Sequence, residues 1–109
     1  MKFLSRPEEI FLLAIWKLRG NAYAVSIRDE VKKLTGKTWS FGAVFITLER
    51  LVNKKYLQSE ISPPTKKRGG RSKRLYSLTR EGKRVLIEIR NLQDSIWSDI
   101  PELTTRSPR

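Results

Sequence analysis

The sequence predicts a mainly α-helical chain with one small β-hairpin, in the order helix, helix, helix, strand, strand, helix. Apolar residues recur at spacings of three and four in four segments, as they do on one face of an α-helix. Two five- or six-residue runs alternate between apolar and polar residues on either side of a Gly-Gly loop, which is typical of a hairpin. With 109 residues, the chain is long enough for about one domain. The predicted fold class is a winged helix-turn-helix followed by one C-terminal helix.

The first helix begins at Pro7, because proline suits a first helical turn and Glu8 and Glu9 favour the positive end of the helix dipole. The run from Ile10 to Leu18 is apolar on nearly every side, and Gly20 ends it. Such a helix must be covered on both sides. We therefore expect a second subunit to contribute part of that cover.

Two further helices follow. The second is amphipathic and closes at Gly36, and its apolar positions are Ala24, Ile27, Val31 and Leu34. Ser40 is the expected N-cap of the third, which runs to about Lys54. One arc of this helix is expected to face the core: Phe41, Val44, Phe45, Leu48, Leu51 and Val52.

The opposite arc of the third helix contains no acid and combines small, hydroxyl, basic and amide side chains: Ala43, Ile46, Thr47, Arg50, Asn53 and Lys54. In a winged helix the third helix can enter the major groove of DNA. Arg50 could contact guanine, and Thr47 and Ile46 could touch thymine methyl groups. We expect base contact by at least one of Ala43, Ile46, Thr47 and Arg50, and phosphate contact by Ser40 and Lys54.

The hairpin is predicted from residues 56–61 and 74–78, which alternate as strands do. The intervening loop holds six cations and no acid within KKRGGRSKR. These side chains would bind phosphate with steep salt dependence, and the two glycines would let the backbone approach closely. The wing residues expected at DNA are Lys66, Lys67, Arg68, Gly69, Gly70, Arg71, Lys73 and Arg74.

The last helix is expected to begin after Thr79, to end at Pro101 and to serve in dimerisation. We expect a DNA-binding unit over residues 1–79, a dimerisation helix over 80–100 and a flexible tail over 101–109. The residues expected at the dimer interface are Phe11, Ile15, Val85, Ile89, Leu92 and Ile96. Two copies related by a two-fold axis would recognise an inverted repeat.

Charge and composition narrow the class of function. The chain has a net charge of +12, and residues 37–79 alone contribute ten basic and two acidic side chains, or +8. A polyanion is therefore the expected partner. Without cysteine or histidine, the usual zinc ligands, disulfides and nucleophilic triads are excluded. The acids lie beside lysine or arginine, so we expect no catalysis, no metal and no cofactor.

The apolar run in the first helix is far shorter than the ~20 residues that a membrane span requires. Two acids precede this run, and no small-residue cleavage site follows it, which is unlike a signal peptide. A soluble cytoplasmic protein with no membrane partner is expected.

Four segments in this order resemble the PadR family of bacterial transcriptional regulators: EEIFLLAIWKL, GNAYAVSIRDEV, SFGAVFITLERLVNKKYL and RGGRSKRLYSLTREGKRVL. The resemblance covers about residues 8–90. It implies a dimeric transcriptional repressor that binds double-stranded DNA and that a small aromatic ligand sometimes releases from the DNA. Trp97 is the candidate for such a ligand pocket, whereas Trp39 could wedge against the DNA backbone.

The chain departs from the family pattern at three positions. A tyrosine common in the third helix is Phe45 here, and a glycine after that helix is Lys55. If the backbone is left-handed at Lys55, the side chain costs roughly 1 kcal/mol. Tyr23-Ala24 replaces a Tyr-Gly pair. This suggests that no neighbouring group needs to approach the backbone closely at this position.

Two other classes of function stay open. A binding module for RNA or the ribosome would use the same loop charge. A protein-interaction adaptor would use the winged helix for a protein partner and the charge for solubility alone.

Overall fold

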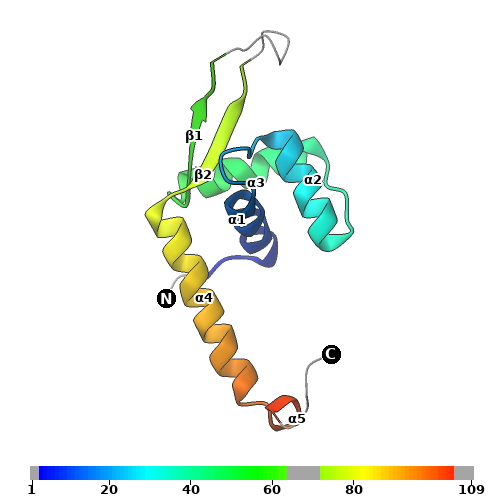
Figure 1. The fold of residues 1–109 in the computed structure, drawn as a ribbon, viewed down its shortest axis with the longest axis vertical. Coiled ribbons are helices and arrows are strands. Elements are labelled where there is room, and N and C mark those ends of the chain that lie inside the picture. The colour runs from blue at the N-terminus through cyan, green and yellow to red at the C-terminus, as the bar shows by residue number, and fades with distance from the viewer. Residues whose placement is uncertain (1–2, 64–71, 105–109) are drawn as a thin grey trace.

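The computed structural model describes residues 3–63 and 72–104 and confirms the predicted fold class (Figure 1). Its elements are α1 (Arg6–Leu18), α2 (Ala24–Thr35), α3 (Phe41–Asn53), β1 (Leu57–Ile61), β2 (Arg74–Leu78), α4 (Arg80–Ser98) and α5 (Pro101–Thr104). The predicted helices and strands therefore all form. Within the segment expected to be a flexible tail, Pro101–Thr104 forms the short helix α5, since proline suits the first position of a helical turn.

Side-chain caps set where the helices begin. The Ser5 hydroxyl accepts a bond from the Glu8 amide, and the Glu8 carboxylate accepts one from the Ser5 amide at 2.9 Å, which completes a capping box. Ser40 caps α3 by accepting from the amide of Ala43, as predicted. Thr79 caps α4 in the same way, without a reciprocal bond, because the third residue of that helix is Gly82.

The hairpin is tied to the helices through its backbone. β1 and β2 pair antiparallel, with Leu57 opposite Leu78. On the other edge of β2, the amide of Tyr76 donates to the carbonyl of Ala22, 2.8 Å away, in the segment between α1 and α2. The turn into β1 passes through Lys55 at φ 69°, so the backbone is left-handed at this position, where the family pattern has glycine.

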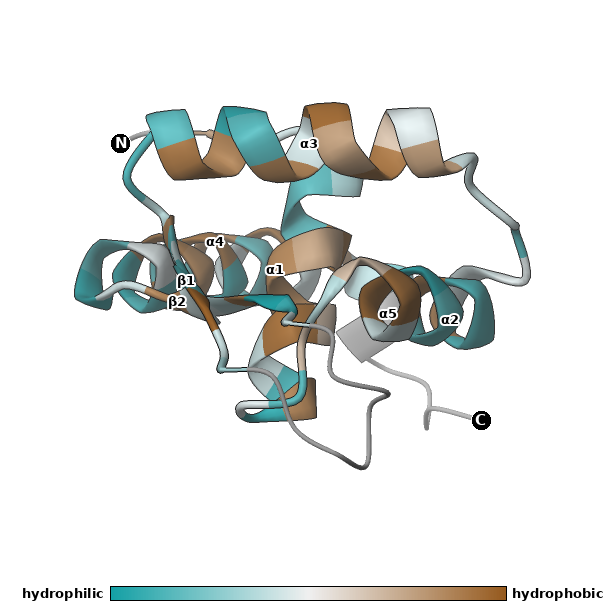
Figure 2. Cartoon of the chain, turned by 90° about the horizontal axis from the view of Figure 1, so that it is seen from above, coloured by the Kyte–Doolittle hydropathy of each residue, from teal (hydrophilic) through white to brown (hydrophobic). Residues whose placement is uncertain are grey.

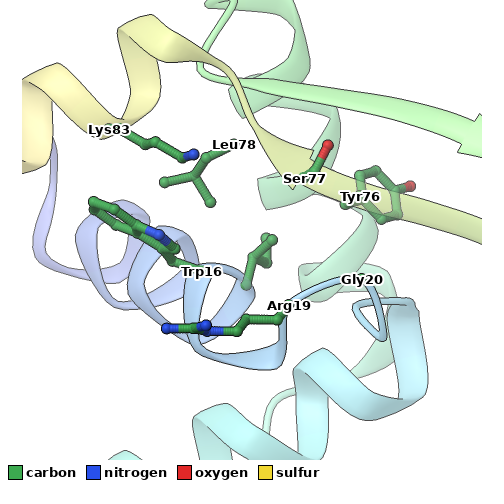
Figure 3. A pocket seen from close by; sticks show the side chains of 8 residues that line it. Trp16, Arg19, Gly20, Tyr76, Ser77, Leu78 and Lys83 are labelled. Atoms are coloured by element: carbon green, nitrogen blue, oxygen red, sulfur yellow. The ribbon is translucent and has the colours of Figure 1, made fainter.

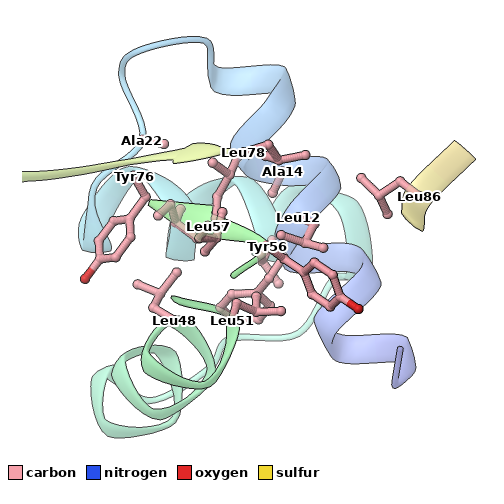
Figure 4. Packing of buried hydrophobic residues seen from close by; sticks show 14 of the residues in the cluster. Leu12, Ala14, Ala22, Leu48, Leu51, Tyr56, Leu57, Tyr76, Leu78 and Leu86 are labelled. Atoms are coloured by element: carbon pink, nitrogen blue, oxygen red, sulfur yellow. The ribbon is translucent and has the colours of Figure 1, made fainter. Parts of the chain in front are cut away.

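Buried apolar side chains from α1, α2, α3, α4 and both strands form the core, part of which is drawn in Figure 4. Leu12 of α1 packs beside Leu48 and Leu51 of α3, with Leu57 and Leu78 from the hairpin closing the same cluster. α3 lies along one side of the molecule, and its outward turns carry both hydrophilic and hydrophobic residues (Figure 2). The core thus holds α3 in place while leaving one of its faces open.

The molecule is elongated, at 56 × 29 × 22 Å. Its radius of gyration is 16.4 Å, whereas a compact chain of this length would have about 13 Å. The difference arises because the C-terminal half of α4 extends away from the other helices (Figure 1). Within residues 3–63 and 72–104, no helix combines the length and the hydropathy needed to cross a bilayer.

Candidate nucleic-acid interface

The open face of α3 is centred on Ile46, whose side chain is 61% exposed. Gly42 lies one turn before it and Arg50 one turn after, and both are exposed. A Cβ added at Gly42 would meet the Ser40 hydroxyl oxygen at an ordinary van der Waals distance of 3.9 Å, so the glycine leaves this turn with little bulk. The arrangement allows a ligand to approach the α3 backbone closely near its N-terminus.

The predicted arcs of α3 are wrong at three positions. Thr47 was expected on the open face, but it is buried at 6% exposure and donates its hydroxyl to the carbonyl of Ala43 at 2.8 Å. That bond satisfies the hydroxyl, so threonine can lie against the core. Phe45 and Phe41 were expected in the core and are instead 52% and 40% exposed. Thr47 is therefore not placed to touch a base, and Phe45 takes its place on the surface.

Lys54 was expected at a phosphate, but its ammonium lies 2.7 Å from the carboxylate of Glu8 at the start of α1. The Glu8 side chain is only 4% exposed. Burial by itself would raise the pKa of Glu8, yet the hydrogen bonds and charge of Lys54, together with the Ser5 cap, hold this pKa below its usual value. The structural role of Lys54 is to join the end of α3 to α1.

A second ion pair joins α1 to α2. The Lys17 ammonium lies 2.8 Å from the carboxylate of the buried Glu30, and Lys33 approaches the same carboxylate at 3.9 Å. The hydrogen bond from Lys17 lowers the pKa of Glu30 despite the opposing effect of burial. The three helices are therefore connected by charge as well as by apolar packing.

Of the wing, the structure describes the two strands and the residues next to them. Arg74 donates to the Ser59 hydroxyl across the hairpin at 3.1 Å, and the ammonium of Lys73 lies 3.7 Å above the ring of Tyr23. Lys73 is thus directed toward the start of α2 by a cation–π contact. The other predicted wing residues lie outside the described residues: Lys66, Lys67, Arg68, Gly69, Gly70 and Arg71.

Arg28 of α2 is a candidate that the sequence analysis missed. Its Nε donates to the carbonyl of Trp39 at 2.6 Å, and its guanidinium lies 4.3 Å from the centre of the Phe41 ring. These contacts hold a cation beside the first turn of α3. The signal in the sequence was an isolated arginine on the polar side of α2, which does not distinguish it from its neighbours.

Trp39 does not lie free to wedge against a DNA backbone. Its ring meets Phe11 edge to face at a centroid distance of 5.5 Å, at the border of the core. The expectation of a DNA wedge is therefore replaced by a packing role, since this contact holds the ring against α1.

Four of the six residues expected at a dimer interface, namely Phe11, Ile15, Val85 and Ile89, are instead buried in the core of one chain. Within one chain these four residues present little surface to a second subunit, although Ile89 still lines the hollow described below. Other apolar side chains of the same two helices are exposed, including Leu13 and Ile87. A groove of about 390 Å³ separates α1 from α4 and is lined by Leu13, Trp16 and Ile87 among others. The groove continues toward Leu92 and Ile96 in a neighbouring hollow of about 260 Å³.

A separate pocket of about 360 Å³ lies where α1, β2 and α4 meet (Figure 3). Trp16 lines it together with Arg19 and Lys83, and the Lys83 ammonium is 5.7 Å from the indole centre. Trp97, the predicted pocket residue, lies on the free end of α4 at 59% exposure and lines neither this pocket nor the α1–α4 grooves. Trp16 is therefore the tryptophan that a small molecule could reach in a pocket of the described chain.

Comparison with known proteins agrees with this architecture. A family model described as "Transcriptional regulator PadR-like family" matches residues 12–88. No curated protein matches the chain significantly.

Several solved structures share the fold. A PadR-like transcriptional regulator from Bacillus cereus has a TM-score of 0.71 at 17% identity, over 93% of both chains. A PadR family transcriptional regulator from Eggerthella lenta has a TM-score of 0.65 at 22% identity, over 94% of this chain and 86% of the other. A PadR family regulator from Clostridium difficile has a TM-score of 0.62 at 21% identity, over 90% and 94%. Since the family model spans most of the chain and these structures share its fold, the chain belongs to the PadR-like family of transcriptional regulators.

Proposed function

We propose that this regulator is a homodimer that binds an inverted repeat in double-stranded DNA and represses transcription. The observation that carries the proposal is the open face of α3, where Gly42, Ile46 and Arg50 are exposed on one side of a helix that the core holds from behind. An exposed helix of this kind in a winged helix-turn-helix can enter the major groove. Arg50 then supplies the donor that suits a guanine edge.

The charge distribution supports a nucleic-acid partner. Residues 37–79, which include α3 and the hairpin, contribute ten of the 23 basic residues and two of the 11 acids. Arg28 adds a cation held against Phe41 at the start of α3. Such a surface would neutralise several phosphates and release their counterions.

The apolar surface of α1 and α4 supports the proposed two-fold dimer. Leu13 and Ile87 stay exposed beside a groove that one chain does not fill. A second copy placed on this groove would present two α3 helices, and its symmetry would require an inverted repeat. Half-sites should then lie about 10 base pairs apart, or a multiple of that.

Selection of bound sequences from a random pool of duplexes tests the proposal. We expect the bound pool to converge on an inverted repeat that outcompetes structured RNA at equal salt. Arg50→Ala should lose about 1–3 kcal/mol of discrimination at one base pair of each half-site. Arg84→Ala, an exposed arginine on α4, is the matched control and should bind as the wild type does.

Three outcomes would contradict the proposal. Preference for structured RNA would favour an RNA-associated module. Binding of neither nucleic acid would favour a protein adaptor. A reporter placed under the selected operator should fall when the protein is expressed, and a rise would show activation instead of repression.

We also propose that the effector implied by the family occupies the pocket at Trp16 and not a site at Trp97. Arg19 and Lys83 would attract a negative group, and the indole would stack on an aromatic ring. Titration with a small aromatic acid should change the fluorescence of the wild type and not that of Trp16→Phe. If Trp16→Phe showed the same fluorescence change as the wild type, the ligand would bind elsewhere.

A further inference from the structure

The centre of the open face of α3 is apolar, which is unusual for a surface expected to meet a polyanion. Ile46 is 61% exposed, and Phe45 beside it is 52% exposed. We call these two side chains the α3 ridge. Neither is needed to complete the core, because Val44, Thr47, Leu48 and Leu51 already cover the inward side of the helix.

The surroundings of the α3 ridge favour DNA over a protein partner. Arg50 follows Ile46 by one turn, and the guanidinium of Arg28 is held above Phe41 at the start of the helix. Within α3, every residue of which is described, the one acid is Glu49. The ridge is thus flanked by these two cations and, one turn after Phe45, by the exposed Glu49. A ligand that carries apolar groups between phosphates would match its apolar centre and its cations.

The major groove contains one such apolar group, the C5 methyl of thymine. Ile46 offers a branched aliphatic tip, and Phe45 offers an aromatic face, both of which can pack against a methyl. Gly42 and the small Ala43 leave the preceding turn without bulk, so the helix can lie deep enough for contact.

We propose that the α3 ridge determines sequence specificity by packing Ile46 and Phe45 against thymine methyl groups in each half-site. This inference rests on the proposed function and specifies which bases its recognition helix selects. It predicts thymines at two positions of the selected half-site, next to the guanine expected at Arg50.

Replacement of thymine by deoxyuridine tests the proposal, since it removes the methyl and leaves base pairing unchanged. Each thymine of the selected duplex is replaced in turn, and the dissociation constant is measured. Loss of one buried methyl should weaken binding about fourfold. We expect this loss at two thymines of a half-site and little change at the others.

Variants assign each methyl to its side chain. At the thymine that Ile46 contacts, Ile46→Ala should bring the ratio of the dissociation constants for the uridine and thymine duplexes close to one. Phe45→Ala should do the same at the thymine that Phe45 contacts. Leu34→Ala removes an equally exposed aliphatic side chain from α2 and should keep both ratios. Both ridge residues are exposed on a helix, so alanine should preserve folding, which thermal unfolding checks.

Ratios near one at every thymine in the wild type would overturn the inference while leaving duplex binding in place. Ratios unchanged in both ridge variants would do the same. If Ile46→Ala instead altered the mass in light scattering without changing the ratios, the ridge would belong to a protein contact, and the inference would be wrong. Failure to bind any duplex would overturn the proposed function itself, together with the inference.

Discussion

Gly82 lies where the first turn of α4 passes over the turn between α3 and β1. A Cβ at this position would stand 2.3 Å from the carbonyl oxygen of Tyr56, which is backbone and cannot move aside cheaply. The Thr79 hydroxyl donates to the carbonyl of Lys55 at 2.6 Å in the same place. A single missing methyl group therefore sets how closely α4 approaches the turn that follows α3.

Gly82→Ala should destabilise the protein by about 1–3 kcal/mol, because the added methyl forces the two backbone segments apart. Urea unfolding measures this loss. The matched control is Gly42→Ala, also within the first turns of a helix, where the added methyl makes only an ordinary van der Waals contact at 3.9 Å and alanine should stabilise by up to about 1 kcal/mol. Equal effects at the two glycines would show that helix propensity, not the contact with Tyr56, decides both.

The carboxylate of Glu8 makes the free energy of unfolding depend on pH in the acidic range. Its pKa in the folded chain is lowered from the ordinary 4.5, with burial opposed by Lys54 and Ser5. A carboxyl whose pKa is lower in the folded chain than in the unfolded chain stabilises the fold at pH values above its unfolded pKa. This stabilisation is lost as the pH falls from about 4.5 through the folded pKa. Glu8→Gln should therefore show a shallower loss of stability over this range.

Thermal unfolding at a series of pH values below neutrality measures that slope. Glu88→Gln alters an exposed carboxylate of α4 and should retain the wild-type slope. If Glu8→Gln and wild type lost stability in parallel, the Glu8–Lys54 pair would not be the source of the acid sensitivity.

At the scale of the element, α3 and the hairpin have different tasks. α3 is held by apolar packing and by Lys54, and its open face carries side chains suited to base edges. The base of the hairpin is anchored by the contacts of Arg74 with Ser59 and of Lys73 with Tyr23. Base selection is therefore expected from α3, whereas the wing is expected to supply affinity without sequence preference.

Removing wing charge should weaken binding to all duplexes alike. Arg71→Ala with Arg74→Ala should lower the slope of log affinity against log salt by about 0.9 for each phosphate that is no longer neutralised. The matched control is Arg80→Ala with Arg84→Ala, which removes the same charge from the first turns of α4. If both double variants changed the slope equally, net charge alone, and not the wing's approach to phosphate, would explain the affinity.

At the scale of the whole molecule, the long α4 leaves apolar side chains without cover. Ile87 on α4 and Leu13 on α1 line the same groove, and the far end of α4 extends beyond the other helices (Figure 1). Burying such surface stabilises by about 25 cal/mol per Å². The groove is thus the expected meeting place of two copies.

Ile87→Glu should place a charge in that groove and give a folded monomer that no longer binds the inverted repeat tightly. Light scattering at tens of micromolar measures the mass, and the wild type should have twice the chain mass. Leu34→Glu, which alters an equally exposed residue of α2, should remain dimeric. A dimeric Ile87→Glu protein would place the interface elsewhere.

Periodicity alone established the helices, the hairpin and the segregation of charge, because these are local properties of residue spacing. Tertiary packing decided which way each helix faces. On α3 it buried Thr47, whose hydroxyl has a partner in Ala43, and exposed Phe45, although hydropathy favours the reverse. On α1 and α4 it directed Phe11 and Val85 into the core and left Leu13 and Ile87 outside. A residue's own hydropathy cannot determine this, since the rotation of a helix depends on the combined shape of the segments packed against it.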